Sequence, residues 1–158
     1  MQKPLRRVKT PLSEQPQNNE EMLHFSLLGL LPPAHTLVLN TALGTLSDIF
    51  VHEDRPQMTA QQQFANSEIS VLLPLLDAYP YYSPYETLYA SFTYGKVTES
   101  ILERCRQHLH EALKEGVWDQ EMRAMRNVLS RTRFKTRAFH IEISAILETG
   151  YILIYRAP

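Results

Sequence analysis

The residues best suited to binding a polyanion lie in one short run, residues 122–140. This run contains six cationic side chains and no acidic one, although the whole chain of 158 residues has a formal net charge of only −1. Guanidinium and ammonium groups neutralise phosphates and release their counterions, so a segment of this composition suits a nucleic acid. The cationic residues are Arg123, Arg126, Arg131, Arg133, Lys135 and Arg137.

Wound as a helix at about 100° per residue, the run separates into two faces. An apolar face can pack on a core, while a neighbouring row of arginines can lie in a nucleic-acid groove. A basic face that is merely solvated, with arginine stems covering apolar surface, is the alternative interpretation. The apolar face holds Met122, Met125, Val128, Leu129, Thr132 and Thr136, and the arginine row holds Arg123, Arg126, Arg133 and Arg137.

Four helices are expected to surround or include this run. Pro74 should kink the first helix or delay its start. The second begins with Ser83 and Glu86 in a capping-box pattern, and Asp119 is expected to cap the basic helix. The expected helices cover residues 67–78, 83–94, 98–115 and 119–138.

Short strands are expected before and after the helices. Residues 36–39 and 45–51 have strand-like composition, and residues 52–56 form a polar turn that closes them. After the basic helix, apolar and polar side chains alternate over residues 140–147. A glycine turn follows, and residues 151–155 are continuously apolar or aromatic. The chain is therefore expected to end in a β-hairpin.

Composition favours one soluble domain with a tail. Apolar content of 44% with 21% charged residues is ordinary for a globular protein. Residues 1–22 are polar and proline-rich and are expected to be a flexible tail, with the domain over residues 23–158. The lone Cys105, expected to be buried, excludes an internal disulfide. With no signal peptide and no long apolar run, we expect a cytoplasmic location and no membrane association.

The order of these motifs along the chain, with strands first, then helices, the basic helix and a final hairpin, resembles the winged helix-turn-helix effector domain of OmpR/PhoB-type transcription regulators. The run Ser130, Arg131, Arg133 and Lys135 is similar to the Ser-Arg-x-Arg-x-Lys run of that family's recognition helix. Gly150, Tyr151 and Leu153 are similar to its closing Gly-Tyr-x-Leu. Residues 67–76, Pro80 and residues 83–89 are similar in order and spacing to its first two helices, and the resemblance covers about residues 36–155.

The resemblance implies an α+β, winged helix-turn-helix fold. This fold has a small N-terminal β-sheet, three to four helices and a C-terminal β-hairpin wing. The sequence departs from the family pattern at Thr132, where leucine is usual, and at Glu148, where the wing tip often carries arginine. Residues 96–118 are also longer than the usual link, and are similar to the linker helices of transcriptional-activation variants.

The function implied by the resemblance is that of a bacterial-type, sequence-specific regulator of transcription. The basic helix would enter the major groove of double-stranded DNA. Arg123, Arg126 and Asn127 are expected to reach base edges, because arginine pairs with guanine and asparagine with adenine. The remaining cations are expected to neutralise phosphates. The full expected set is Arg123, Arg126, Asn127, Ser130, Arg131, Arg133, Lys135 and Arg137.

The partners expected beyond DNA are proteins. A homodimer on repeated half-sites is one candidate, and RNA polymerase or another protein is a second. No enzyme activity, metal or cofactor is expected, since the six histidines lack metal-ligand spacing and no nucleophile or phosphate-loop motif occurs.

A winged-helix module that binds proteins without touching DNA is the main alternative. Six tyrosines crowd one region and would form an aromatic contact surface if exposed, or pack around the second helix with only their hydroxyls outward. RNA binding is a further alternative, although no base-stacking motif is evident. DNA binding predicts that Arg126 and Arg133 are exposed and free of carboxylates, whereas a protein adaptor predicts that they are paired and that the tyrosine surface is open. The tyrosines are Tyr79, Tyr81, Tyr82, Tyr85, Tyr89 and Tyr94.

Overall fold

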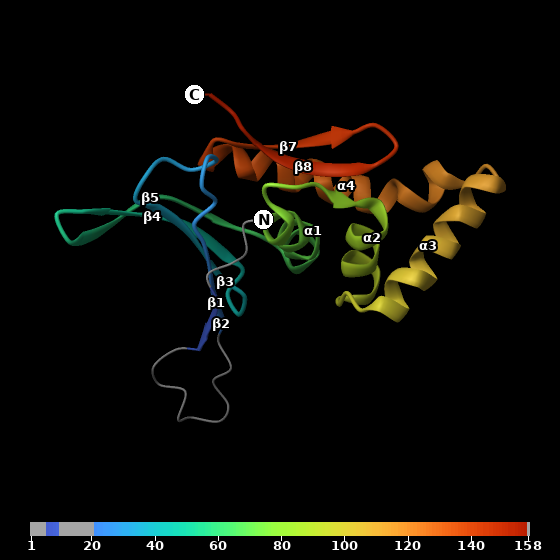
Figure 1. Cartoon of the computed structure of the whole chain (residues 1–158), viewed down its shortest axis with the longest axis horizontal. Coiled ribbons are helices and arrows are strands. Elements are labelled where there is room, and N and C mark those ends of the chain that lie inside the picture. Colours follow the sequence, from blue (N-terminus) through green and yellow to red (C-terminus); the bar gives the residue numbers. More distant parts are fainter. Residues whose placement is uncertain (1–5, 10–20, 158) are drawn as a thin grey trace.

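The computed structural model describes residues 6–9 and 21–157. These residues form four α-helices and two antiparallel sheets, which confirms the α+β part of the expected fold. The larger sheet lies at one end of an elongated molecule, and helices α2 and α3 lie at the other (Figure 1). Between them lie α1 and α4, with a C-terminal hairpin along α4.

The larger sheet is a five-stranded antiparallel meander in sequence order. Its two central strands alternate in burial, with Leu37, Leu39 and Leu46 directed toward the core. The two short strands expected here are confirmed, and the polar turn after them is shorter than expected, at residues 53 and 54. Two further strands precede this pair in the described part of the chain, and one follows it. The strands are β1 (Arg6–Lys9), β2 (Glu21–Phe25), β3 (His35–Asn40), β4 (Thr45–His52) and β5 (Arg55–Gln63).

The flexible tail expected over residues 1–22 is wrong at both of its described parts. Residues 6–9 form β1, whose backbone pairs with β2 from Arg6 opposite His24 to Lys9 opposite Glu21. Backbone pairing satisfies amide groups whatever the side chains are, so the polar composition of this segment did not exclude a strand. The other residues of the expected tail lie outside the described part of the chain.

All four expected helices are confirmed, with small changes at their ends. Ser83 and Glu86 do not form the expected capping box, because Ser83 and Pro84 form the short strand β6 and Glu86 binds Arg106 at 3.3 Å. Asp119 lies inside the first turn of α4 rather than at its cap. The helices are α1 (Asn66–Ala78), α2 (Tyr85–Tyr94), α3 (Glu99–Lys114) and α4 (Trp118–Thr136), which continues into the 3-10 turn η1 (Arg137–Phe139).

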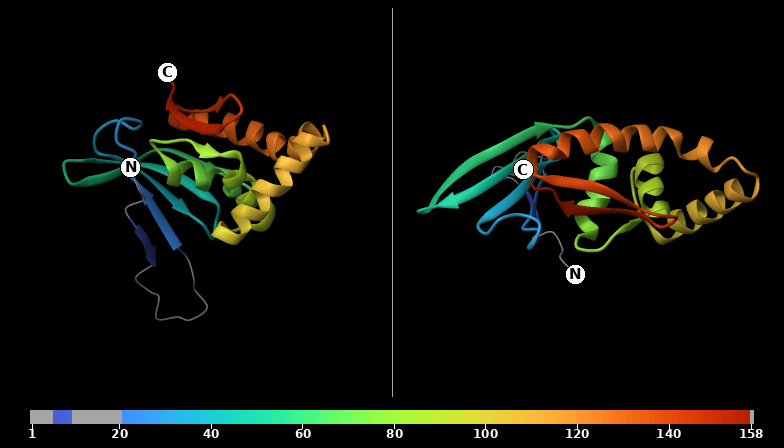
Figure 2. Two further views of the ribbon diagram at one scale, coloured as in Figure 1. Left: turned by 45° about the vertical axis from the view of Figure 1, so that its right-hand side comes forward. Right: turned by 90° about the horizontal axis from the view of Figure 1, so that it is seen from above.

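The expected C-terminal hairpin is confirmed as β7 (Ile141–Ile146) and β8 (Gly150–Tyr155). Strand β6 (Ser83–Pro84) pairs with β8, so the smaller sheet has the order β6-β8-β7. The start of α2 is thereby attached to the hairpin, which lies beside α4 in both further views (Figure 2).

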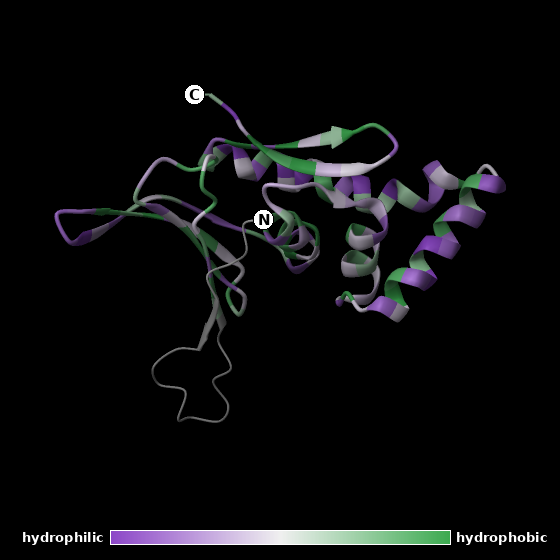
Figure 3. Cartoon of the chain, in the orientation of Figure 1, coloured by the Kyte–Doolittle hydropathy of each residue, from purple (hydrophilic) through white to green (hydrophobic). Residues whose placement is uncertain are grey.

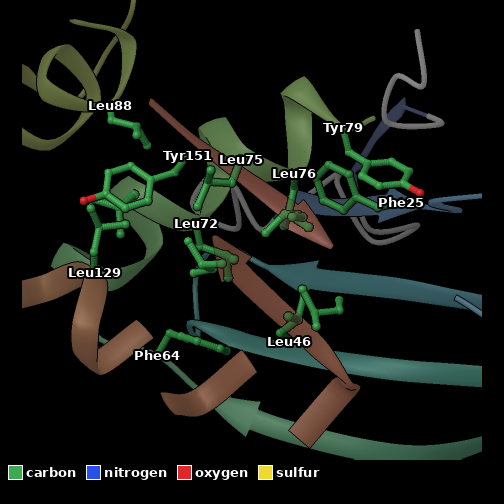
Figure 4. Close-up of a cluster of buried hydrophobic side chains, with 14 of the residues drawn as sticks. Phe25, Leu46, Phe64, Leu72, Leu75, Leu76, Tyr79, Leu88, Leu129 and Tyr151 are labelled. Atoms are coloured by element: carbon green, nitrogen blue, oxygen red, sulfur yellow. The ribbon is translucent and has the colours of Figure 1, made fainter. Parts of the chain in front are cut away.

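One hydrophobic core joins the sheet, α1, α2, α4 and the hairpin. Leucines of α1 occupy its centre and face side chains from every other layer (Figure 4). A smaller cluster of Ala90, Ile101 and the buried Cys105 joins α3 to the outer side of α2. The labelled core residues in Figure 4 are Phe25, Leu46, Phe64, Leu72, Leu75, Leu76, Tyr79, Leu88, Leu129 and Tyr151.

Pro74 lies inside α1 and is accommodated by a contact with α2. Proline has no backbone N–H, so the carbonyl of Ser70 lacks its usual partner within the helix. The Ser91 hydroxyl of α2 donates a hydrogen bond to that carbonyl at 2.5 Å. The break in the hydrogen-bond ladder therefore becomes a specific link between α1 and α2.

We predict that Gly150→Ala destabilises the fold by about 2–3 kcal/mol, the scale of overpacking in a core. A Cβ atom at residue 150 would overlap the carbonyl oxygen of Ser83 and force β6 away from β8. Urea denaturation measures the change in the free energy of unfolding.

The matched control is Gly95→Ala. Gly95 has a φ of 73°, and no atom lies within 4 Å of the place that a Cβ atom would take, so only backbone strain of about 1–2 kcal/mol applies there. An effect at residue 150 no larger than at residue 95 would contradict close packing of β6 on β8.

Candidate functional site

Helix α4 buries the apolar face that its sequence predicts. This face packs against α1 and β7, so the scaffold fixes the rotation of the helix. Two threonines within it keep their hydroxyls satisfied locally: Thr132 donates to the Val128 carbonyl at 2.8 Å and Thr136 to the Arg133 carbonyl at 3.0 Å. The buried residues of α4 are Met122, Met125, Val128, Leu129, Thr132 and Thr136.

The opposite side of α4 is exposed and contains no carboxylate between residues 123 and 137. Its members recur every three or four residues, as one stripe of a helix does. Hydrophilic and hydrophobic segments alternate along α4 and α3, as expected of helices that bury one side (Figure 3). We call this stripe the outer face; it consists of Arg123, Asn127, Ser130, Arg131, Phe134 and Arg137.

Arg126 and Arg133 lie at one edge of the outer face and are paired. Arg126 donates to the carboxylate of Asp119 at 3.1 Å, within the same helix. Arg133 donates through Nε to the Ile143 carbonyl at 2.9 Å and lies 3.8 Å from a carboxylate oxygen of Glu142. The expectation for DNA binding that both arginines are free of carboxylates is therefore wrong. Arg133 instead attaches α4 to strand β7.

A buried carboxylate holds the C-terminal half of α4. The side chain of Glu68, on the first turn of α1, is only 3% exposed and accepts a hydrogen bond from Lys135 Nζ at 2.7 Å. The Ala65 backbone N–H donates to the same oxygen, Oε1, at 2.7 Å, and Arg131 Nε lies 3.6 Å from the other oxygen, Oε2. Lys135 also donates to the Gln63 carbonyl at 2.9 Å. The group Glu68, Arg131 and Lys135 is called the Glu68 cluster below.

The Glu68 cluster alters the acidity of its central group. Burial by itself raises the pKa of Glu68, because it disfavours the charged form. The hydrogen bonds from Lys135 and Ala65 and the positive charges of Lys135 and Arg131 outweigh burial, so the pKa is lowered. No local sequence pattern predicts this cluster, because Glu68 and Lys135 lie 67 residues apart.

The outer arginines differ in how firmly they are held. Arg131 is 56% exposed despite its position beside Glu68. Arg137 is exposed, and its guanidinium lies 5.9 Å from the centroid of the Phe134 ring, a cation–π contact. Arg123 is exposed and forms no ion pair with any described residue. Three arginines are therefore available to a ligand along the length of α4.

The tyrosine region is only partly open. Tyr79 is buried, and its hydroxyl donates to the Leu28 carbonyl at 2.9 Å. Tyr85 packs edge-on against Trp118, with ring centroids 5.4 Å apart. Tyr89 is also half-buried, and the three exposed members are Tyr81, Tyr82 and Tyr94.

Besides an exposed contact between the neighbouring residues His52 and Glu53, two histidine–carboxylate pairs of the described residues connect different elements. His35 Nδ1 lies 2.9 Å from an oxygen of buried Asp48 and links β3 to β4. His108 lies 3.0 Å from Glu121 and links α3 to α4. Within the described part of the chain, no group of three or more histidine, cysteine or acidic residues is placed to hold a metal ion. Nor does any described helix have the length and apolar character needed to cross a bilayer.

Comparison with protein-family models, with curated proteins and with solved structures finds no match to this chain. A function must therefore be argued from the site itself, its geometry and its chemistry.

We predict that Glu68→Gln destabilises the protein by about 1–3 kcal/mol at neutral pH, the scale of a hydrogen bond to a charged group. Because the folded pKa of Glu68 is lowered, its contribution is complete above the unfolded pKa of about 4.3 and is lost as pH falls through the lower folded value. The difference between wild type and variant should therefore shrink in acid. Urea denaturation across a pH series measures it.

The control is Glu103→Gln, which removes an exposed carboxylate that contacts Arg106 at 2.7 Å. An exposed pair of this kind contributes less than about 1 kcal/mol. Equal effects at residues 68 and 103, or a difference at Glu68 that does not change with pH, would contradict the role of the buried carboxylate.

Proposed function

We propose that this protein is a DNA-binding regulator of transcription with a winged helix-turn-helix domain of the OmpR/PhoB type. In this proposal α4 is the recognition helix and lies in the major groove of double-stranded DNA, with β7 and β8 as the wing. The observation that carries the proposal is the outer face of α4. Three arginines, an asparagine and a serine are exposed there on a helix whose other side is fixed in the core.

The dimensions and chemistry of α4 suit a groove. Its 19 residues span about 28 Å at 1.5 Å each, and a major groove about 12 Å wide admits one helix. Arg123, Asn127 and Arg131 are placed to reach base edges, where arginine recognises guanine and asparagine recognises adenine. Arg137, at the end of the helix, is placed to neutralise a phosphate.

The paired cations take secondary roles in this proposal. Asp119 is 85% exposed, so its pair with Arg126 contributes at most about 1 kcal/mol and can be exchanged for a phosphate. Arg133 and Lys135 are held by the scaffold and position α4. Glu148 at the hairpin tip would repel phosphate, so the proposal assigns DNA contact to α4 rather than to the wing.

A protein-binding module is the second candidate, and two observations favour it. Arg126 and Arg133 are paired with carboxylates, as expected for an adaptor. Near the hairpin tip, Leu147 and Leu113 are 88% and 62% exposed and line a pocket with Trp118. Such a surface suits an apolar partner. Arg126, at the edge of the outer face, also lines this pocket, so the proposed protein-binding surface adjoins the proposed DNA-binding surface.

The test is fluorescence anisotropy of the full chain with a random duplex pool over a salt series. We expect affinity to fall steeply with salt, and the triple variant Arg123→Ala/Arg131→Ala/Arg137→Ala to bind more weakly. Arg137 is the one of these three arginines assigned to a phosphate, so the slope of log affinity against log salt should fall by about 0.9. The lost base contacts of Arg123 and Arg131 should weaken binding at every salt concentration.

A charge-matched control removes three exposed cations from α3 and the loop before it, in Lys96→Ala/Arg104→Ala/Lys114→Ala. This variant should retain the wild-type slope. No binding at low salt, or equal losses in the two triple variants, would contradict groove binding by α4 and favour the protein-binding candidate.

A further inference from the structure

Phe134 lies in the middle of the basic outer face and is 71% exposed. The inner side of α4 is filled without it, by methionine, valine, leucine and threonine side chains that are all buried. Phe134 therefore has no role in the core that would explain an aromatic residue at this position.

The surroundings of Phe134 are charged and polar. Arg137 lies over its ring at 5.9 Å from the centroid. The shallow pocket beside the ring is lined by Ser130, Arg131 and Lys135, together with Ala65 and the buried Glu68 that Lys135 and Arg131 neutralise. An exposed ring among cations is solvated until a ligand covers it, and a ligand that approaches the arginines must also cover the ring. The outer face thus offers one apolar contact among several charge-assisted ones.

Double-stranded DNA presents a matching apolar group. The major groove is lined by hydrogen-bonding groups, but the 5-methyl group of thymine projects into it and is contacted by apolar side chains, phenylalanine among them. A methyl group at the same position of cytosine occupies the same place in the groove. On α4, Asn127 and Phe134 are seven residues and about 10.5 Å apart, close to three base-pair steps of about 3.4 Å.

We propose that Phe134 is a specificity-determining residue that contacts the 5-methyl group of a pyrimidine in the major groove. This inference rests on the proposed function, because it requires α4 to lie in that groove. Phe134 contributes discrimination at one base pair, while the neighbouring arginines supply affinity.

The experiment begins with duplexes selected from a random pool by the full chain at low salt. In each selected site, every thymine is replaced in turn by uracil, which lacks the methyl group, and every cytosine by 5-methylcytosine. We expect one pyrimidine position at which removal of the methyl group weakens wild-type binding about fourfold, the effect of one buried methyl group. Phe134→Ala should bind the methylated and unmethylated forms of that position equally.

Two further variants separate a specific contact from a general loss of apolar surface. Phe134→Leu keeps an apolar side chain and should retain part of the methyl preference. Leu147→Ala removes another exposed apolar side chain, at the hairpin tip, and should retain all of the methyl preference. If replacing thymine by uracil weakens binding, the methyl group that Phe134 contacts is that of thymine. If replacing cytosine by 5-methylcytosine strengthens binding, the contacted methyl group is that of the modified cytosine.

The failures are distinguishable. If the chain binds DNA but no position responds to the methyl group, or if Phe134→Ala responds as the wild type does, the Phe134 inference is overturned and the DNA-binding proposal stands. If the chain binds no duplex at low salt, the DNA-binding proposal itself fails, and the Phe134 inference fails with it.

Discussion

The carboxylate of Glu68, buried beneath α4, is the interaction on which the placement of the basic helix depends. A charge removed from water must be compensated by a close partner, and here Lys135 supplies it at 2.7 Å with Arg131 nearby. Glu68 also accepts the backbone N–H of Ala65, so the same carboxylate caps α1 and holds α4. Rotation of α4 would leave this charge without a partner, and the hydrophobic inner face would lose its packing as well.

Apart from Arg126, which pairs with Asp119 of the same helix, the basic residues of this run form two sets with different roles. Arg133 and Lys135 face the scaffold and connect α4 to β7 and α1. Arg123, Arg131 and Arg137 face outward, with Asn127 and Phe134 between them. A charge count alone overstates the surface available to a polyanion, because three of the six cations already donate hydrogen bonds to a carboxylate or a carbonyl. The spacing of the outward set, rather than the total charge, is what suits a groove.

Periodicity in the sequence was sufficient to predict the helices and the final hairpin. A 3.6-residue apolar repeat indicates which side of α4 is buried, and all six predicted inward residues are buried. Composition does not predict strands that are held by backbone hydrogen bonds and contribute few side chains to the core. Strand β5 is polar and mostly exposed at residues 55–63, because it lies at the edge of the sheet with few side chains in the core. Strand β6 was missed for a similar reason, since its two residues pair with β8 through the backbone.

The sequence predicts which side of α4 is exposed but not the electrostatics of that side. Charge and spacing indicate the basic segment, and the family resemblance implies the eight candidate residues within it. The ion pairs of Arg133 and Lys135 could not be predicted, because their partners Glu142 and Glu68 belong to other elements that only the fold brings to α4. The same apolar repeat places Phe134 on the exposed side of α4, but one aromatic residue within a basic run does not by itself indicate a binding contact, and its exposure on the outer face is seen only in the structure.

The most direct test of groove binding by α4 is a nuclear magnetic resonance titration of the isotopically labelled full chain with a short duplex at low salt. Groove binding predicts that shifts or broadening concentrate at the side-chain Nε signals of Arg123, Arg131 and Arg137 and at the backbone amides of α4's outer face. Arg133, held by Ile143 and Glu142, should change less. Changes centred instead on the region of the exposed Tyr81, Tyr82 and Tyr94, or no changes at all, would contradict it.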